Sequence, residues 1–324
     1  MALTTTKHWR WDAPGAHTLT GEVGSARNLL RDFLEDCGWS VSWEDAGAQK
    51  VVLRNSQAHG GSGGYLRIVD DGSVPTLGAR AFQTWFYEDM TDIDTGTGAC
   101  QVTAGVWVKS ITADSTPRPY FLAADQRTFH CNIFTHDPPN IGTYFVEHVA
   151  GSCGDLDPAI PGDHGCYAAW PRWAFANNSA SIIGALSPYN KATEPDARFF
   201  TARNSSLLAD PTSIGCVVKP LTNSVQPNLG LGGSSFVAAY PAAGYVDGTF
   251  SCPYIAGEVN GAVRGALRGL RIPTAFIPGN VAANWGVFSE LGSGRDFVLL
   301  RANTTAAVGP VFDCALLIDT TGPW

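Results

Sequence analysis

Charged side chains are scarce in this sequence. Asp, Glu, Lys and Arg together make up 15% of the residues, well below the roughly 25% of ordinary soluble domains. Long solvated helices need charged outer faces, so this shortage disfavours a helical protein. The 36 Gly and 20 Pro instead favour many short strands joined by tight turns.

A basic excess and a membrane-spanning run are also missing. The net charge of −8 disfavours nucleic-acid binding, because that affinity comes largely from Lys and Arg on phosphates. No apolar run approaches the roughly 20 residues of a membrane span. The first residues lack the charged and apolar blocks of a signal peptide. We therefore expect a protein that is made in the cytoplasm and has neither nucleic-acid nor membrane partners.

The cysteines show no metal-binding pattern, since the sequence has neither a C-x-x-C pair nor a Cys/His cluster at zinc spacing. One interpretation is that they are small buried hydrophobic residues. The alternative is that they form disulfides after release from the cell, with pairings that spacing alone does not reveal. The candidate disulfide residues are Cys37, Cys100, Cys131, Cys153, Cys166, Cys216, Cys252 and Cys314.

One amphipathic helix is predicted near residues 25–37. Ser25 is a favourable N-cap and Gly38 a C-terminal stop. Four apolar residues share one face, and charged residues are expected on the other face: Leu29, Leu30, Phe33 and Leu34 against Arg27, Arg31, Asp32, Glu35 and Asp36. This helix is expected to lie against a sheet.

The rest of the pattern indicates strands. Trp39, Val41 and Trp43 alternate with serines, which predicts that all three share one face of a strand. Further strands are expected at residues 51–54, 65–69, 79–87, 101–109, 120–124, 128–134, 142–147, 264–271, 297–301 and 314–318. Residues 151–182 are rich in Gly, Asp, Pro and Trp, and are predicted to be irregular.

We therefore predict a mainly β protein, an antiparallel sandwich or barrel with one short N-terminal helix and a long loop-rich central insertion. Residues 1–150 would form a β-rich core and residues 151–250 a loop-rich insertion or second lobe. The strands of residues 251–324 would return to the core, and the whole chain could form one domain.

The segment from Gly60 to Gly64 matches the G-x-S-x-G pattern of serine hydrolases, with Ser62 at the nucleophile position and His59 before it. A nucleophile elbow needs a helix after the serine. The following residues, Tyr65 to Val69, instead have the pattern of a strand, so a flexible hairpin is favoured.

An acidic run and two histidines are the other candidates for chemistry. Residues 88–96 carry Glu88, Asp89, Asp92 and Asp94, but lack the late Glu of a calcium-binding EF-hand loop, so a solvated turn is favoured. His130 and His136 flank Cys131 and could share a metal site after folding. The default interpretation is that the two histidines are ordinary packing residues of a strand and a loop. We predict no catalytic, cofactor-binding or metal-binding constellation.

Tryptophans could stack on sugars in a host-surface glycan-binding module, with Trp170 and Trp173 as the candidate residues. Large aromatic residues in strands are more often part of the core. Core packing is therefore the favoured interpretation for the aromatic run, which comprises Trp9, Trp11, Trp39, Trp43, Trp85, Trp107, Trp170 and Trp173.

Six segments, in order along nearly the whole chain, resemble a family of structural proteins of tailed-bacteriophage particles: residues 65–71, 87–98, 123–129, 153–155 with 161–163, 263–270 and 318–324. The last of these ends in the motif Asp319-Thr320-Thr321-Gly322-Pro323-Trp324. The chain departs from the family at Cys153, where an aromatic residue is usual, and in its higher cysteine content.

The resemblance implies a virion protein that is not an enzyme, needs no cofactor, and assembles in the bacterial host cytoplasm with copies of itself and other virion proteins. The expected place is the neck, tail or baseplate, with disulfides as a means of stabilisation. The alternatives are a capsid decoration protein and a tail module that binds host glycans.

Overall fold

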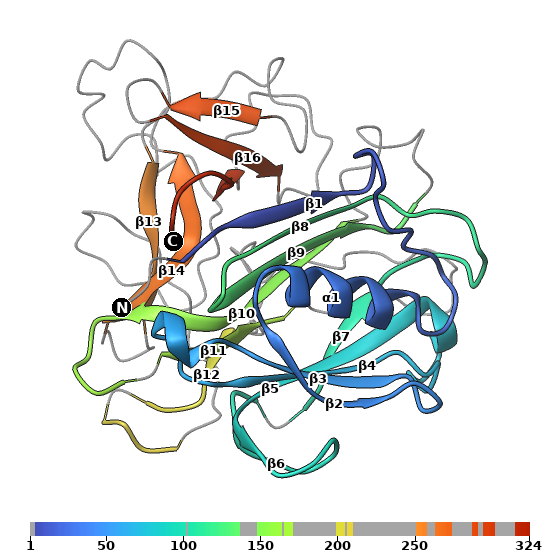
Figure 1. Cartoon of the computed structure of the whole chain (residues 1–324), viewed down its shortest axis with the longest axis horizontal. Coiled ribbons are helices and arrows are strands. Elements are labelled where there is room, and N and C mark those ends of the chain that lie inside the picture. The colour runs from blue at the N-terminus through green and yellow to red at the C-terminus, as the bar shows by residue number, and fades with distance from the viewer. Residues whose placement is uncertain are drawn as a thin grey trace.

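The structure is a computed structural model of the 324-residue chain (Figure 1). The description covers residues 4–101, 103–136, 148–163, 165–170, 199–204, 206–209, 251–257, 263–273, 287–290, 294–301 and 315–324. Every structural statement below refers to these residues.

The larger of two sheets has eleven strands in the described part of the chain. Its main path runs β1 (Lys7–Arg10), β8 (Tyr120–Ala124), β9 (Thr128–Phe134), β10 (His148–Pro158), β14 (Val263–Pro273), β17 (Ala315–Asp319), β16 (Arg295–Arg301) and β15 (Val287–Glu290). Off this path, β11 pairs with β10 and β12, and β13 pairs with β14, where these strands are β11 (Cys166–Ala169), β12 (Phe199–Thr201) and β13 (Ser251–Gly257).

The smaller sheet has six strands, and every strand pairing described in either sheet is antiparallel. Its path is β2 (Ser40–Asp45), β3 (Lys50–Arg54), β4 (Tyr65–Val69), β5 (Ala81–Met90) and β6 (Gly96–Ala99), with β7 (Gly105–Val108) on β5. Two short 3-10 turns, η1 (Gln57–His59) and η2 (Gly78–Arg80), lie between these strands. The mainly β, antiparallel fold expected from the sequence, a sandwich or barrel with one short helix, is confirmed.

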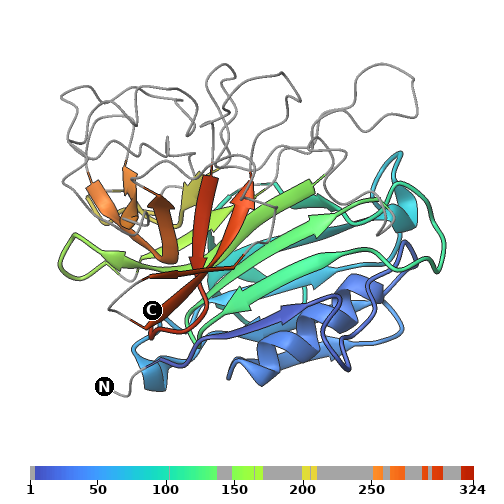
Figure 2. The ribbon, with the colours of Figure 1, turned by 90° about the horizontal axis from the view of Figure 1, so that it is seen from above.

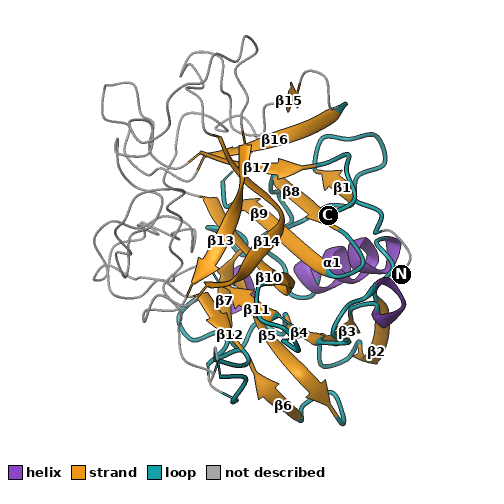
Figure 3. Ribbon diagram, turned by 90° about the vertical axis from the view of Figure 1, so that its left-hand side faces the viewer, coloured by secondary structure: helices purple, strands orange, loops and turns teal. Residues whose placement is uncertain are grey.

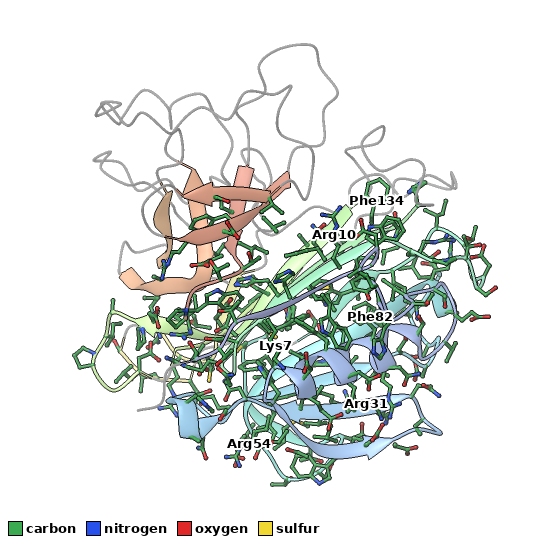
Figure 4. All side chains as sticks on the ribbon, turned by 45° about the horizontal axis from the view of Figure 1, so that its top comes forward. Lys7, Arg10, Arg31, Arg54, Phe82 and Phe134 are labelled. Atoms are coloured by element: carbon green, nitrogen blue, oxygen red, sulfur yellow. The ribbon has the colours of Figure 1, made fainter. Side chains whose placement is uncertain are left out.

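The main core lies between the two sheets, and the helix α1 (Ser25–Asp36) closes one side of it (Figures 2 and 3). Phe82 of β5 is fully buried there and stacks on Trp107 of β7 (Figure 4). Phe33 of α1 contacts Trp9 beside it and Phe129 of β9. The apolar stripe of the helix therefore packs on the larger sheet as well as the smaller one.

The start of α1 differs from the prediction. Ser25 is the first helical residue and not the cap, and its hydroxyl accepts the Thr20 N–H. The N–H groups of Ala26 and Arg27 are instead bound by the carboxylate of Asp70. Arg27 was expected on the exposed face but is buried, and it pairs with Glu44. Asp70, which is distant in sequence, thus caps the helix in place of Ser25.

Three predicted strands, residues 65–69, 120–124 and 128–134, coincide with β4, β8 and β9. The prediction that residues 151–182 are irregular is wrong where it overlaps β10 and β11, which form because they pair with each other and with neighbouring strands. The strand expected at 142–147 lies outside the described residues. Strand β10 also runs across the expected boundary at residue 150, and the C-terminal strands join the same sheet.

The shared face predicted for Trp39, Val41 and Trp43 is wrong for Trp43. The pairing of β2 with β3 shifts register between Val41 and Trp43, so a bulge reverses the alternation there. Trp39 and Val41 pack in the core between the sheets. Trp43 packs instead with Tyr65 in a small cluster outside that core.

Candidate functional site: a buried arginine–aspartate network

Arg268 of β14 lies at the centre of a buried polar network that joins distant parts of the chain. Its guanidinium donates to Asp125, in the turn between β8 and β9, at 2.6 Å. It also donates to Asp157 of β10 and to the carbonyl oxygen of Trp324. Because guanidinium carries several donors in a fixed fork, one side chain can hold three segments together.

Asp125 is held in place by its own turn. Its Oδ1 accepts the N–H groups of Arg127 and Thr128 at 2.8 and 2.7 Å, the local pattern that favours Asp in turns. The indole of Trp39 donates to its carbonyl oxygen at 2.9 Å. The turn itself therefore fixes the position of this carboxylate.

Arg127 extends the network to a second aspartate. Its Nε lies 3.5 Å from Asp155 Oδ2, and its Nη1 lies 3.8 Å from Asp157 Oδ1. Asp155 is buried and accepts the backbone N–H and the hydroxyl of Ser62 at 2.8 and 2.6 Å. Burial raises the pKa of Asp155, and the bonds from Ser62 oppose that rise. We call Asp125, Arg127, Asp155, Asp157 and Arg268 the arginine–aspartate network.

The terminal motif folds into what we call the C-terminal clasp, residues 319–324. The carboxylate of Asp319 accepts the N–H groups of Thr321 and Gly322, and Trp324 donates its indole N–H to the Asp319 carbonyl at 2.8 Å. The Trp324 ring then lies over Gly269 and edge-on to His130. A Cβ on Gly269 would sit 2.1 Å from the indole, so the clasp requires glycine there.

The clasp also binds the N-terminal segment. Thr4 Oγ1 donates to the Trp324 carbonyl oxygen at 3.0 Å, and Thr6 donates to the Gly322 carbonyl oxygen. On the far side of the network, Arg264 of β14 pairs with Asp163. Four of the six segments that carry the resemblance therefore contact one another here.

A second buried pair was not foreseen. Asp70 directly follows β4, and its carboxylate lies in the core against Lys109, with both side chains fully buried. Lys109 Nζ lies 2.6 Å from each carboxylate oxygen. A lysine within an apolar strand run, Gly105–Val108 followed by Lys109, was the one signal in the sequence of a buried cation that needs a partner.

Ser62 is not arranged as the nucleophile of a serine hydrolase would be. It lies in the loop between η1 and β4, so a strand follows it, as predicted. Its hydroxyl donates to Asp155, while His59 Nδ1 is bonded to Ser56 at 2.9 Å. The serine thus ties the smaller sheet to β10.

Only the second half of the acidic run forms the predicted turn, between β5 and β6, whereas Glu88 and Asp89 belong to β5. Asp92 Oδ1 accepts the N–H groups of Asp94 and Thr95, and Asp94 pairs with Lys50 and Arg67. The described residues contain no group of three His, Cys, Asp or Glu side chains arranged to hold a metal ion.

The histidines do not meet. His130 is buried within β9 and its Nε2 donates to the Arg268 carbonyl oxygen at 2.7 Å. His136 lies past the end of β9 and bonds Thr135 at 3.2 Å. His130, Cys131 and His136 form no group that could hold a metal ion in the described part of the chain, so the structure gives the shared metal site no support.

Three of the eight tryptophans in the described residues are buried and the other five are partly buried, so the expectation that they are core residues holds for a minority of them. Trp39, Trp107 and Trp170 are buried, and Trp170 packs edge-on against Trp107. Trp170 therefore cannot stack on a glycan, and that assignment is wrong. Trp173 lies outside the described residues.

The structure describes the side chains of five of the eight cysteines, and these bear on the choice between buried hydrophobic residues and disulfides. Cys37, Cys100, Cys131, Cys153 and Cys166 are unpaired and buried in the structure, which favours the interpretation as buried hydrophobic residues for them. Cys131, Cys153 and Cys166 belong to the apolar core between the sheets. The side chains of Cys216, Cys252 and Cys314 lie outside the description.

No protein-family model matches the chain, and no curated protein matches it in sequence. Within the described part of the chain, no helix has the length and apolar character needed to cross a membrane.

Proposed function

We propose that this chain is an accessory structural protein of a tailed-bacteriophage particle. It would assemble in the host cytoplasm in several copies around the neck, tail or baseplate, and act through contacts with itself and other virion proteins rather than by catalysis. The proposal rests on the six segments that resemble such proteins.

The observation that carries the proposal is that residues of those segments bind one another inside the protein. Asp125, Arg268 and Trp324 belong to three of them and bind one another inside the protein. Arg268 and Asp125 are at most 4% exposed. The polar groups of a binding or catalytic motif usually converge on an open cleft. Here the motif residues are used to hold the fold, which favours a structural role.

The test is to count the chain in purified particles of the phage that encodes it. Tryptic peptides of this chain are quantified against those of the major capsid protein, after the particles have been banded in a density gradient. We expect tens of copies or fewer per particle. Hundreds of copies would favour the capsid decoration alternative, and absence from intact particles would overturn the structural proposal.

A further inference from the structure

Lys109 and Asp70 are placed for a reaction with each other. Lys109 Nζ lies 2.6 Å from both Asp70 Oδ1 and Oδ2. An amine nitrogen equidistant from two carboxylate oxygens lies about 3 Å from the carbon between them, which is within the separation of reacting atoms. A rotation of the carboxyl group about its bond to Cβ would present its face to the amine. We propose that Lys109 and Asp70 condense spontaneously to form an intramolecular isopeptide bond.

Both residues are held firmly at the backbone. Asp70 follows β4, donates its N–H to the Gln49 carbonyl at 3.0 Å and accepts the Gly24 N–H at 2.9 Å. Lys109 follows β7 and donates its N–H to the Arg80 carbonyl at 2.9 Å. Because β4 and β7 both pair with β5, the new bond would link two strands across a third.

The carboxyl oxygen that stays in the product already has donors. Asp70 Oδ2 accepts the N–H groups of Ala26 at 2.9 Å and Arg27 at 3.4 Å, in the first turn of α1. When the amine attacks, negative charge develops on this oxygen. Backbone donors and the positive end of the helix dipole stabilise such a charge, as in an oxyanion hole.

The reaction balances without an oxidant or another reactant. The Lys109 ammonium passes one proton to Oδ1, which leaves an amine and a neutral acid. The amine forms the Nζ–Cγ bond, a second proton moves from Nζ to Oδ1, and the Cγ–Oδ1 bond breaks to release water. The remaining N–H can keep the bond that Nζ makes to the Glu22 carbonyl oxygen, now 2.5 Å long.

Burial favours the neutral forms that this reaction needs. It raises the pKa of Asp70 to about 6, against the opposing effect of Lys109. It also lowers the pKa of Lys109, against the opposing effect of Asp70. The pair of Lys50 and Asp94 provides a contrast: its nitrogen lies 2.8 Å from both oxygens, but both groups are reached by solvent. Water keeps that pair charged, so no bond is expected there.

The experiment is mass spectrometry of the purified full-length chain after denaturation. We expect an intact mass lower than the sequence mass by one water molecule, and a branched tryptic peptide joining residue 70 to residue 109. Lys109→Arg and Asp70→Ala should each restore the full mass. Lys50→Arg, the matched control at the exposed pair, should leave the water loss unchanged.

Two outcomes would overturn the proposal. The first is a wild-type chain with its full sequence mass. The second is a water loss that persists in Lys109→Arg, because a succinimide at Asp71-Gly72 would cause the same change in mass without lysine. If the variants fail to fold, the wild-type digest decides alone: fragment ions either place the branch at Lys109 or show an unmodified lysine there.

Discussion

Arg268 donates to Asp125 at 2.6 Å, and this ion pair joins two segments that are 143 residues apart in the chain. Both side chains are buried. The same guanidinium binds Asp157 and the Trp324 carbonyl oxygen, so a single residue connects β10, the β8–β9 turn and the C-terminal clasp.

Replacing Arg268 with Met should destabilise the protein strongly, because it leaves the Asp125 carboxylate buried without its cation. Removing one partner of a buried ion pair costs about 3–5 kcal/mol in the free energy of unfolding. Urea unfolding followed by tryptophan fluorescence measures this cost. Lys50→Met breaks an exposed pair instead and should cost under about 1 kcal/mol. Equal costs at the two sites would show that Arg268 is not central to the fold.

Gly269→Ala should release the C-terminal clasp, and Gly294→Ala is its matched control. The two glycines have φ of +67° and +68°, but a Cβ meets Trp324 at Gly269 and nothing within 4 Å at Gly294. Both variants lose about 1–2 kcal/mol to backbone strain. Gly269→Ala should lose about 1–3 kcal/mol more through the clash.

The clash can be isolated by combining Gly269→Ala with Trp324→Ala. Once the indole is gone, the two glycine variants should differ little in their free energies of unfolding. Carboxypeptidase digestion gives a second readout, since a released clasp is cleaved faster. An unchanged difference between the glycine sites in the Trp324→Ala background would contradict the contact.

His130 should make the protein less stable in acid. Burial lowers its pKa from 6.5 to about 4 in the folded state. Between those values the unfolded chain binds a proton that the folded chain does not, so stability falls as pH falls, by up to about 3 kcal/mol.

Comparing wild type with His130→Gln isolates the contribution of the histidine. The glutamine amide can still donate to the Arg268 carbonyl oxygen but does not titrate. Unfolding free energies are measured for both proteins at pH 7 and pH 4.5. The loss of stability on acidification should be smaller in the variant, and parallel pH profiles would contradict the assignment.

The five described cysteines should not react in the native protein. Burial raises the pKa of the thiols of Cys100, Cys131, Cys153 and Cys166, and only the thiolate is nucleophilic. Iodoacetamide labelling with peptide mapping should find these positions and Cys37 unmodified until denaturant is added. Native labelling at any of them would be the contrary result.

A gel of particles with and without reductant tests crosslinking through Cys216, Cys252 and Cys314.

Local patterns were enough to predict the strands at Tyr120–Ala124 and Thr128–Phe134, because apolar runs flank a turn whose Asp binds its own backbone. They failed at Cys153-Gly154-Asp155, whose composition is typical of a turn. That segment is a strand because β9 and β11 pair with its two edges. A register shift likewise moved Trp43 to another face.

By itself, the sequence determined the fold class and the helix near residue 25, since these depend on composition and short-range periodicity. Only the tertiary structure decided what the polar residues do. It placed Asp70 against Lys109 and Arg268 against Asp125, and left the five described cysteines unpaired. Periodicity reports which way a side chain faces, whereas the group that it meets depends on how segments far apart in the chain come together.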